Sequence, residues 1–229
     1  MKTMKIAVPI TDKTEIDILN KAILINSSKA DIVEWRVDFY EDVKNANKVL
    51  ETLQNLRDIV TNKQIIFTLR TKDQGGNVEV STNYYMELNT RASNSKNIDY
   101  IDIEMQYLDK IQNIDVQIIG SYHNFNETPS RDEILSIFKD MESKKADILK
   151  IALMPNTAKD VLILLDATYD MYRSTDRPII SISMGELGKI SRVSGGLFGS
   201  SLTFASLGKG SAPGQMSLEE LYLAMELLY

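Results

Sequence analysis

Short runs of β-branched and other apolar residues alternate along the chain with longer segments in which apolar residues recur at helical spacing. The short runs predict eight strands. Their expected bounds are Lys5–Ile10, Ile32–Val37, Gln64–Leu69, Tyr100–Glu104, Gln117–Tyr122, Ile148–Ala152, Ile179–Met184 and Leu202–Ala205. Strands that alternate with helices are typical of parallel sheets with right-handed crossovers.

Start signals and apolar spacing support the helices between these strands. Ser130 and Glu133 form a capping box, because the serine oxygen can accept an N–H that the first turn leaves unpaired and the glutamate returns the bond. Ser217 and Glu220 repeat this pattern, and Thr14 and Thr157 are further expected caps. Two sets of residues follow i, i+3, i+4, i+7 spacing: Val161, Leu164, Leu165 and Thr168, and Leu218, Leu221, Tyr222 and Met225.

Eight strands with roughly eight helices favour an α/β fold of the (β/α)8 TIM-barrel type, with residues 1–229 as a single domain. A doubly wound open sheet is the alternative architecture. Such a sheet usually carries a glycine-rich phosphate loop after its first strand, whereas Ile10 is followed by Thr-Asp-Lys-Thr. We find no linker, internal repeat or low-complexity tract.

Polar residues within the predicted strands share one parity. They are Glu34 and Arg36, Thr68 and Arg70, Asp102 and Glu104, Ser121 and His123, and Lys150. Side chains of a barrel strand alternate between the interior and the helix layer, so we expect these groups to point inward. They gather toward the carboxyl ends of the strands, where barrel enzymes place their active sites.

Composition narrows the chemistry that this interior can perform. The 229 residues include no cysteine and one histidine. The missing cysteines exclude disulfides, thiolate catalysis, Fe–S clusters and cysteine-type zinc sites, and a single histidine cannot form a metal-binding cluster, so we expect no metal. Proton chemistry near neutral pH must use His123 or a strongly shifted Lys, Glu, Asp or Tyr.

The charge distribution limits the partners. With 26 basic and 32 acidic residues the net charge is −6, and no basic stripe interleaved with aromatic residues suggests nucleic acid. The first residues lack the apolar region of a signal peptide. The longest uncharged stretch, from Val193 to Gly208, is too short to span a bilayer. We therefore expect a soluble cytoplasmic protein with no membrane or nucleic-acid partner.

Lys150 lies in the middle of an apolar strand and allows two interpretations. It could pair with Glu34 or Glu104 in a structural ion-pair network, or it could be a Schiff-base nucleophile. Keeping an ordinary lysine neutral at pH 7 costs ~4.6 kcal/mol. Nearby cations lower this cost, and the candidates are Arg36, Arg70 and Arg192.

His123 shares its parity with Lys150 on the neighbouring strand, which favours a catalytic role over a structural one. Arg192 could bind a carboxylate or phosphate bidentately. The segment Gly208–Gln215 could be a lid over the substrate or merely a flexible connection. The segment GELGKI (185–190) superficially suggests a Walker loop, but the required upstream glycine and the Ser or Thr after the lysine are missing. We therefore reject a phosphate-binding loop there.

Eight motifs occur together in order and span nearly the whole chain. They are EWRVD (34–38), FTLRTKDQGG (67–76), IDIE (101–104), SYHNF (121–125), LKIALMP (149–155), SMGELGKISR (183–192), FGSSLTF (198–204) and SAPGQ (211–215). On these motifs the chain resembles the type I 3-dehydroquinate dehydratase (type I dehydroquinase) family of the shikimate pathway, which belongs to aromatic amino acid biosynthesis.

The resemblance implies a TIM-barrel lyase that forms a homodimer, uses no metal or cofactor and dehydrates 3-dehydroquinate. By resemblance, Lys150 forms the imine with the substrate ketone, and His123 acts first as general base and then as general acid. The other matched positions would bind substrate or order the site: Glu34, Arg36 and Arg70, and, for the carboxylate and hydroxyl groups, Arg192, Ser211 and Gln215, the last two on the lid.

Three positions depart from the family pattern. Gln74 stands where many members have glutamate beside the histidine, Asn124 replaces a common aspartate, and Pro9 replaces a serine or threonine. An amide can orient an imidazole but cannot stabilise an imidazolium as a carboxylate does. Two alternatives stay open: a class I aldolase-type lyase on the same fold, which also uses a barrel lysine, and, because of Gln74, a degenerate binding protein without turnover.

Overall fold

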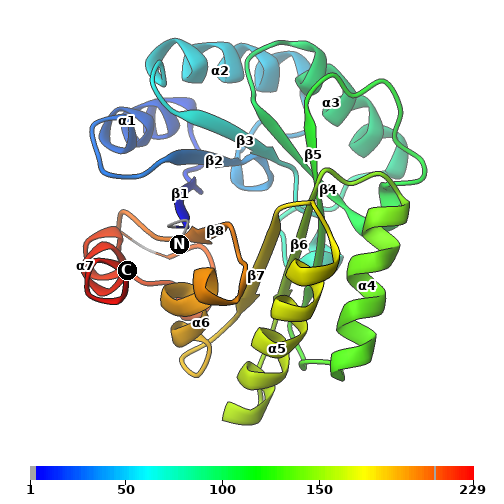
Figure 1. The fold of residues 1–229 in the computed structure, drawn as a ribbon. Helices are drawn as coiled ribbons and strands as arrows, with labels where there is room; N and C mark the ends of the chain where they lie inside the picture. The colour runs from blue at the N-terminus through cyan, green and yellow to red at the C-terminus, as the bar shows by residue number, and fades with distance from the viewer. Residues whose placement is uncertain (1–3, 209) are drawn as a thin grey trace.

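Eight parallel strands form a barrel in the computed structural model, which describes residues 4–208 and 210–229 (Figure 1). The strands are β1 (Lys5–Ile10), β2 (Ile32–Arg36), β3 (Gln64–Thr68), β4 (Tyr100–Glu104), β5 (Gln117–Asn124), β6 (Ile148–Leu153), β7 (Ile179–Ser183) and β8 (Leu202–Phe204). All eight predicted strands are present. The third, seventh and eighth are each one residue shorter than predicted, and the sixth is one residue longer.

The sheet follows the order β7-β6-β5-β4-β3-β2-β1-β8. Its two ends meet, because Ile179 and Ser200 form a parallel bridge and the Ser201 N–H donates to the Ile179 carbonyl at 2.7 Å. This contact closes the sheet into a barrel. The prediction of a (β/α)8 barrel is therefore confirmed, and the alternative of an open doubly wound sheet is wrong.

Two strand ends differ from the prediction in ways that affect the site. β2 stops at Arg36 because Val37 begins a short 3-10 turn. β5 continues past Tyr122, since His123 and Asn124 pair with Ala152 and Leu153 of β6. His123 is consequently held inside the sheet by regular strand pairing, which fixes its distance from β6.

Seven α-helices surround the barrel in the described part of the chain, rather than the predicted eight or so. They are α1 (Glu15–Asn26), α2 (Ala46–Ile59), α3 (Thr82–Asn94), α4 (Arg131–Ser143), α5 (Ala158–Ser174), α6 (Lys189–Ser194) and α7 (Leu218–Leu228). The β4–β5 connection has only a 3-10 turn, Met105–Tyr107. Asn113 in this connection has a φ of 58°, which a right-handed helix does not accommodate.

The predicted helix starts are confirmed. Ser130 and Ser217 each form a complete capping box with the glutamate three residues later. Thr157 forms one with Asp160, and the Thr14 hydroxyl accepts the Asp17 N–H. These bonds satisfy donors that the first helical turn leaves unpaired.

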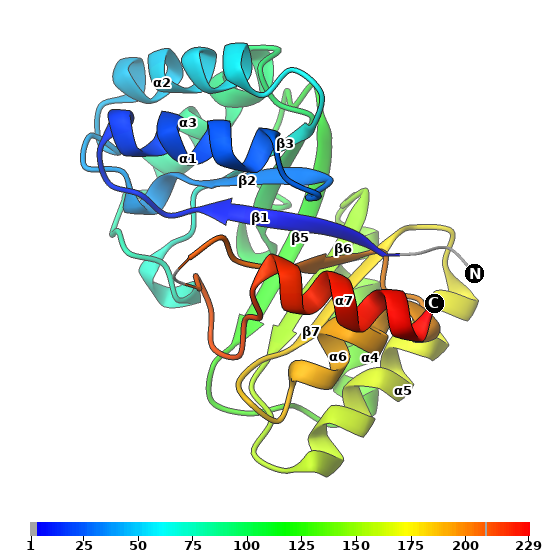
Figure 2. The same ribbon diagram turned by 90° about the vertical axis from the view of Figure 1, so that its left-hand side faces the viewer.

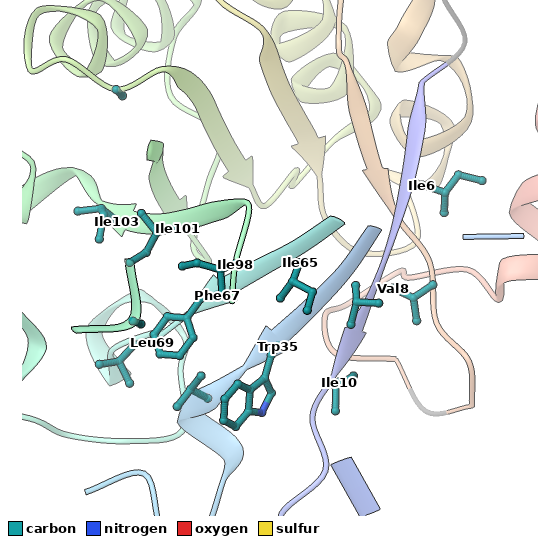
Figure 3. Close-up of a cluster of buried hydrophobic side chains, with 14 of the residues drawn as sticks. Ile6, Val8, Ile10, Trp35, Ile65, Phe67, Leu69, Ile98, Ile101 and Ile103 are labelled. Atoms are coloured by element: carbon teal, nitrogen blue, oxygen red, sulfur yellow. The ribbon is translucent and has the colours of Figure 1, made fainter. Parts of the chain in front are cut away.

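Because successive side chains of a strand point to opposite faces, the apolar residues form two separate layers. The outer layer lies between strands and helices and includes Val8, Trp35 and Phe67 (Figure 3). The inner layer lies inside the barrel and includes Ile66 and Ile148. The predicted parity is confirmed most clearly in β6, where Leu149, Ile151 and Leu153 face outward while Ile148, Lys150 and Ala152 face inward.

The two ends of the barrel carry different connections. β1 begins and α7 ends at one end, and the loop between β8 and α7 lies at the other, beside the carboxyl end of β1 (Figure 2). Across residues 4–208 and 210–229, no helix has both the length and the apolar character needed to cross a membrane.

We predict that Leu149→Ala lowers the free energy of unfolding by about 2–5 kcal/mol, because this fully buried side chain leaves a cavity in the outer layer. Leu162→Ala is the matched control, since Leu162 is 66% exposed on α5, and we expect a change within about 0.5 kcal/mol. Urea unfolding followed by circular dichroism measures both, and equal losses would contradict the layer assignment.

Candidate active site

A cavity of about 80 Å³ lies at the carboxyl ends of the strands. It is lined by all eight site residues that the sequence singles out: Glu34, Arg36, Arg70, His123, Lys150, Arg192, Ser211 and Gln215. Gln74 also lines it, as do apolar groups that include Phe125 and Phe204. Residues from five strands, from the loops that follow β3, β5, β7 and β8, and from the segment Lys189–Ser194 thus converge on one space at the end of the barrel where active sites occur.

Lys150 is the central cation of this cavity and is 5% exposed. Its Nζ lies 2.8 Å from Asp102 Oδ2 and 3.7 Å from Glu34 Oε1. Of the two partners predicted for Lys150, Glu34 is therefore confirmed. Glu104 is wrong, because its carboxylate is taken by Arg70 and by the backbone and hydroxyl of Thr71.

Asp102 is the principal partner of Lys150, and it also binds Arg70. Its Oδ1 lies 2.8 Å from Arg70 Nη2 and accepts the Ser121 hydroxyl. Burial acts to raise the pKa of Asp102, but the charges of Arg70 and then Lys150 outweigh it and hold the pKa well below its ordinary value. Asp102 stays ionised throughout the neutral range. The sequence placed Asp102 in the interior but did not identify it as the partner of the lysine.

Glu34 and Arg36 occupy the same face of β2. The Thr68 hydroxyl donates to Glu34 Oε1 at 3.0 Å. Arg36 binds Asp38 with two donors, Nε and Nη2, each at 2.8 Å. The bidentate pair fixes the plane of the guanidinium at the edge of the cavity.

His123 is placed by contacts with its backbone and with the face of its ring. Its N–H donates to Gln74 Oε1 at 2.9 Å, and its ring stacks near Phe125 with centroids 6.2 Å apart and an interplanar angle of 12°. Its Nδ1 is buried and has no hydrogen-bond partner within the described residues. Burial, followed by the charges of Arg70 and Lys150, lowers the pKa of His123 well below its usual value. The imidazole is therefore neutral at pH 7.

Two of the departures from the family pattern are now located. Gln74 contacts the main chain of His123 rather than its ring. The adjacent Gly75 has a φ of 78°, and a Cβ there would lie 2.3 Å from the Phe125 ring. Asn124 Oδ1 accepts the N–H groups of Asn126 and Glu127, so it shapes the loop after β5.

Arg192 on α6 is almost wholly buried, at 1% exposed. Its Nη2 donates to the Pro213 carbonyl at 3.0 Å, while its Nε has no partner among the described residues. Among residues 4–208 and 210–229, no carboxylate lies within salt-bridge distance of Arg192. Burial lowers its pKa to about 10. A buried guanidinium with an unused donor is suited to a ligand anion.

The predicted lid, Gly208–Gln215, folds against the cavity; position 209 lies outside the described residues. Gln215 Oε1 accepts from the N–H and hydroxyl of Ser211, and its Nε2 donates to the Ala205 carbonyl. Gly214 packs so tightly that a Cβ there would lie 2.0 Å from the Gly185 carbonyl oxygen. Close backbone packing thus joins this loop to the segment after β7.

The fold and the cavity define a class: a (β/α)8-barrel protein with a buried lysine and a neutral histidine at the carboxyl end of its strands. Comparison with known proteins identifies the family. The family model for type I 3-dehydroquinase matches residues 6–229. The chain therefore belongs to the type I 3-dehydroquinase family and is a hydro-lyase, so the aldolase alternative is wrong.

Relatives and solved structures agree with this assignment. The 3-dehydroquinate dehydratase of Clostridioides difficile (strain 630) is 42% identical over 98% of this chain and 92% of its own length. That of Listeria welshimeri is 40% identical over the same shares. A crystal structure of the type I enzyme from Clostridium difficile with covalently modified comenic acid has a TM-score of 0.95, at 42% identity, covering 100% of this chain and 93% of that one. The structure from Geobacillus kaustophilus also gives 0.95, at 31% identity, covering 100% and 95%.

The lowered pKa of His123 makes stability depend on pH. The unfolded histidine binds a proton near pH 6.5, whereas the folded one resists it, so the unfolded state takes up more protons as the pH falls. Between pH 7.5 and 5.5 we expect this residue to remove up to about 1.4 kcal/mol of stability. Urea unfolding of wild type and His123→Gln at both pH values isolates the effect. An identical pH dependence in the two proteins would show that His123 titrates normally.

Proposed function

We propose that the protein dehydrates 3-dehydroquinate to 3-dehydroshikimate through an imine on Lys150, with His123 as general base and then general acid. The observation that carries this proposal is the placement of a buried lysine and a neutral histidine on adjacent strands of one cavity. Ser121 pairs with Lys150 and His123 with Ala152, so the histidine lies one side-chain step further toward the cavity mouth.

The lysine supplies an electron sink. The Lys150 ammonium first gives up a proton, its amine attacks the C3 ketone, and the proton returns as water leaves, so ammonium and ketone together yield one protonated imine and one water. This imine makes the neighbouring C2 proton acidic. The imine carries one positive charge, as the ammonium did, so Asp102 at 2.8 Å and Glu34 at 3.7 Å can pair with either form. The reaction therefore proceeds without leaving a buried carboxylate unpaired.

The histidine moves the protons. Because its lowered pKa keeps it neutral, His123 can accept the C2 proton. The resulting enamine expels the C1 hydroxyl, and the protonated imidazole donates to the leaving oxygen. Hydrolysis of the imine then releases the product. The substrate carboxylate brings a negative charge that opposes the effect of Arg70 and Lys150 on the imidazole, which strengthens it as a base.

The remaining residues orient the ring. Arg192 offers its unused Nε–H to the substrate carboxylate, and Ser211 and Gln215 on the covering loop bind the carboxylate and hydroxyl groups. Fixing the ring in this way lets both proton transfers reach the same histidine. Glu34, Arg36 and Arg70 also line the cavity, where they bind substrate or order the site.

The family resemblance supports the wider setting of this function. The protein acts as a homodimer in the cytoplasm, in the shikimate pathway, and residues 1–229 work as one catalytic domain without a metal or cofactor. The segment 208–215 covers the substrate during turnover. Its contacts with Arg192 and with the segment after β7 are consistent with that role.

Incubation with 3-dehydroquinate and borohydride should give a stable adduct on Lys150, and Lys150→Met should abolish both adduct and turnover. Lys189→Met is the matched control, because this partly exposed lysine on α6 lies outside the cavity and forms a salt bridge with Glu186. Intact and peptide masses locate the adduct, and ultraviolet absorbance of the conjugated enone follows turnover. An adduct on another lysine, or none, would overturn the imine assignment.

His123→Ala should still form the adduct but should lose turnover by about 10²–10⁴-fold, the usual contribution of a general acid–base group. Tyr122→Phe, on the outward face of the same strand, should leave kcat within about twofold of wild type. Undiminished turnover in His123→Ala would contradict its role. An adduct without turnover in the wild-type protein would instead identify a degenerate binding protein.

A further inference from the structure

A second and larger cavity, of about 640 Å³, lies at the amino ends of the strands, at the opposite end of the barrel from the active site. Its volume is within the range that small-molecule sites occupy. None of the proposed catalytic or substrate-binding residues lines it. The reaction proposed above therefore gives this cavity no role.

The floor of this cavity is apolar. It is made by inward-facing residues near the amino ends of six strands, which are Ile32, Ile66, Ile119, Ile148, Ile180 and Leu202. Ile148 lies two residues before Lys150 on the same face of β6, so this layer separates the cavity from the buried charges above it. An apolar group placed on this floor would lose its contact with water without leaving a polar atom unpaired.

Part of the rim carries positive charge. Lys5 lies on the inward face of β1, two residues before Ala7 of the inner layer. Its Nζ donates to Gln64 Oε1 at 2.8 Å, which leaves two of its three N–H donors for a ligand. Arg177 lies just before β7 and also lines the cavity.

Ser200 and Ser201, just before β8, lie between these two cations on the same part of the rim. The Lys5 N–H donates to the Ser201 carbonyl on one side, and Ser200 bridges Ile179 on the other. Arg177 donates to the Ala146 carbonyl and lies 3.9 Å from Glu142, so it keeps donors to spare. Asp176, the acidic residue of the lining, is exposed at its edge.

We propose that this amino-end cavity is a second ligand site, for a small carboxylate with an apolar, ring-sized body. The apolar body covers the isoleucine floor, and the carboxylate lies on the rim between Lys5 and Arg177. Two cations at one mouth of a protein with net charge −6 make that rim locally attractive to an anion. The volume accommodates one aromatic ring with a short side chain.

The same floor discriminates against the substrate of the active site. 3-Dehydroquinate carries hydroxyl groups around its ring, and on a floor of isoleucine side chains these would lose hydrogen bonds to water without replacement. The two ends of the barrel are thus suited to different acids. A polyhydroxylated ring fits the charged end, and an apolar ring fits the amino end.

Isoleucine-methyl NMR can test the proposal directly, with 3-phenylpropanoate as the probe and 3-phenylpropanamide as its neutral match. Ile119 and Ile148 report on the amino-end cavity, Ile182 reports on the active site, and Ile103 in the outer layer is the unaffected control. We expect saturable shifts of Ile119 and Ile148 with the acid, at lower concentration than with the amide. The reporters are independent of the imine chemistry, so this test and that of the proposed function can fail separately.

Two variants examine the rim. Lys5→Met and Arg177→Gln should each weaken binding of the acid by at least about threefold, leave binding of the amide unchanged, and keep wild-type dehydratase turnover. The use of two variants guards against a folding defect in either one. Equal binding of acid and amide, shifts confined to Ile182, or no effect of both substitutions would overturn the proposal.

Discussion

The pairing of Lys150 with Asp102 inside the barrel is the interaction on which the rest of the site depends. A buried charge is tolerated only when it is paired and hydrogen-bonded, and Asp102 meets this condition through Lys150, Arg70 and Ser121. Because the same carboxylate can pair with an ammonium or with a protonated imine, the structural requirement and the chemistry need the same arrangement. Removing Asp102 would leave two buried cations short of a partner.

The barrel makes this arrangement possible because the side chains along each strand alternate strictly between the helix layer and the barrel interior. In β6, Leu149 and Ile151 anchor the strand to the helix layer while Lys150 between them faces inward. The outward face provides apolar burial, and the inward face is left free to carry charge. The inward face itself changes along the strand, from Ile148 at the amino end to Lys150 above it, and this change gives the two ends of one barrel different ligand chemistries.

His123 and Arg192 are tuned by burial rather than by a carboxylate partner. The pKa values of both are lowered by loss of water, further helped at His123 by neighbouring cations. Gln74 accepts a hydrogen bond from the backbone of His123 and adds no charge to the ring. A neutral imidazole beside two cations and a guanidinium with an unused donor leave the cavity ready for an anion. The substrate's own carboxylate then completes the electrostatics of the site.

The sequence by itself determined the alternation of strands and helices, the helix caps and the face on which each polar strand residue lies, because these are local consequences of period and capping chemistry. Only the tertiary structure decided which inward groups meet. Parity put Asp102 and Glu104 on one face, but strand register and side-chain reach placed Asp102 between Lys150 and Arg70, and left Glu104 to Arg70 and Thr71. The contact of Gln74 with a main-chain N–H, the helix missing after β4 and the amino-end cavity likewise depend on how distant segments pack, which no local pattern encodes.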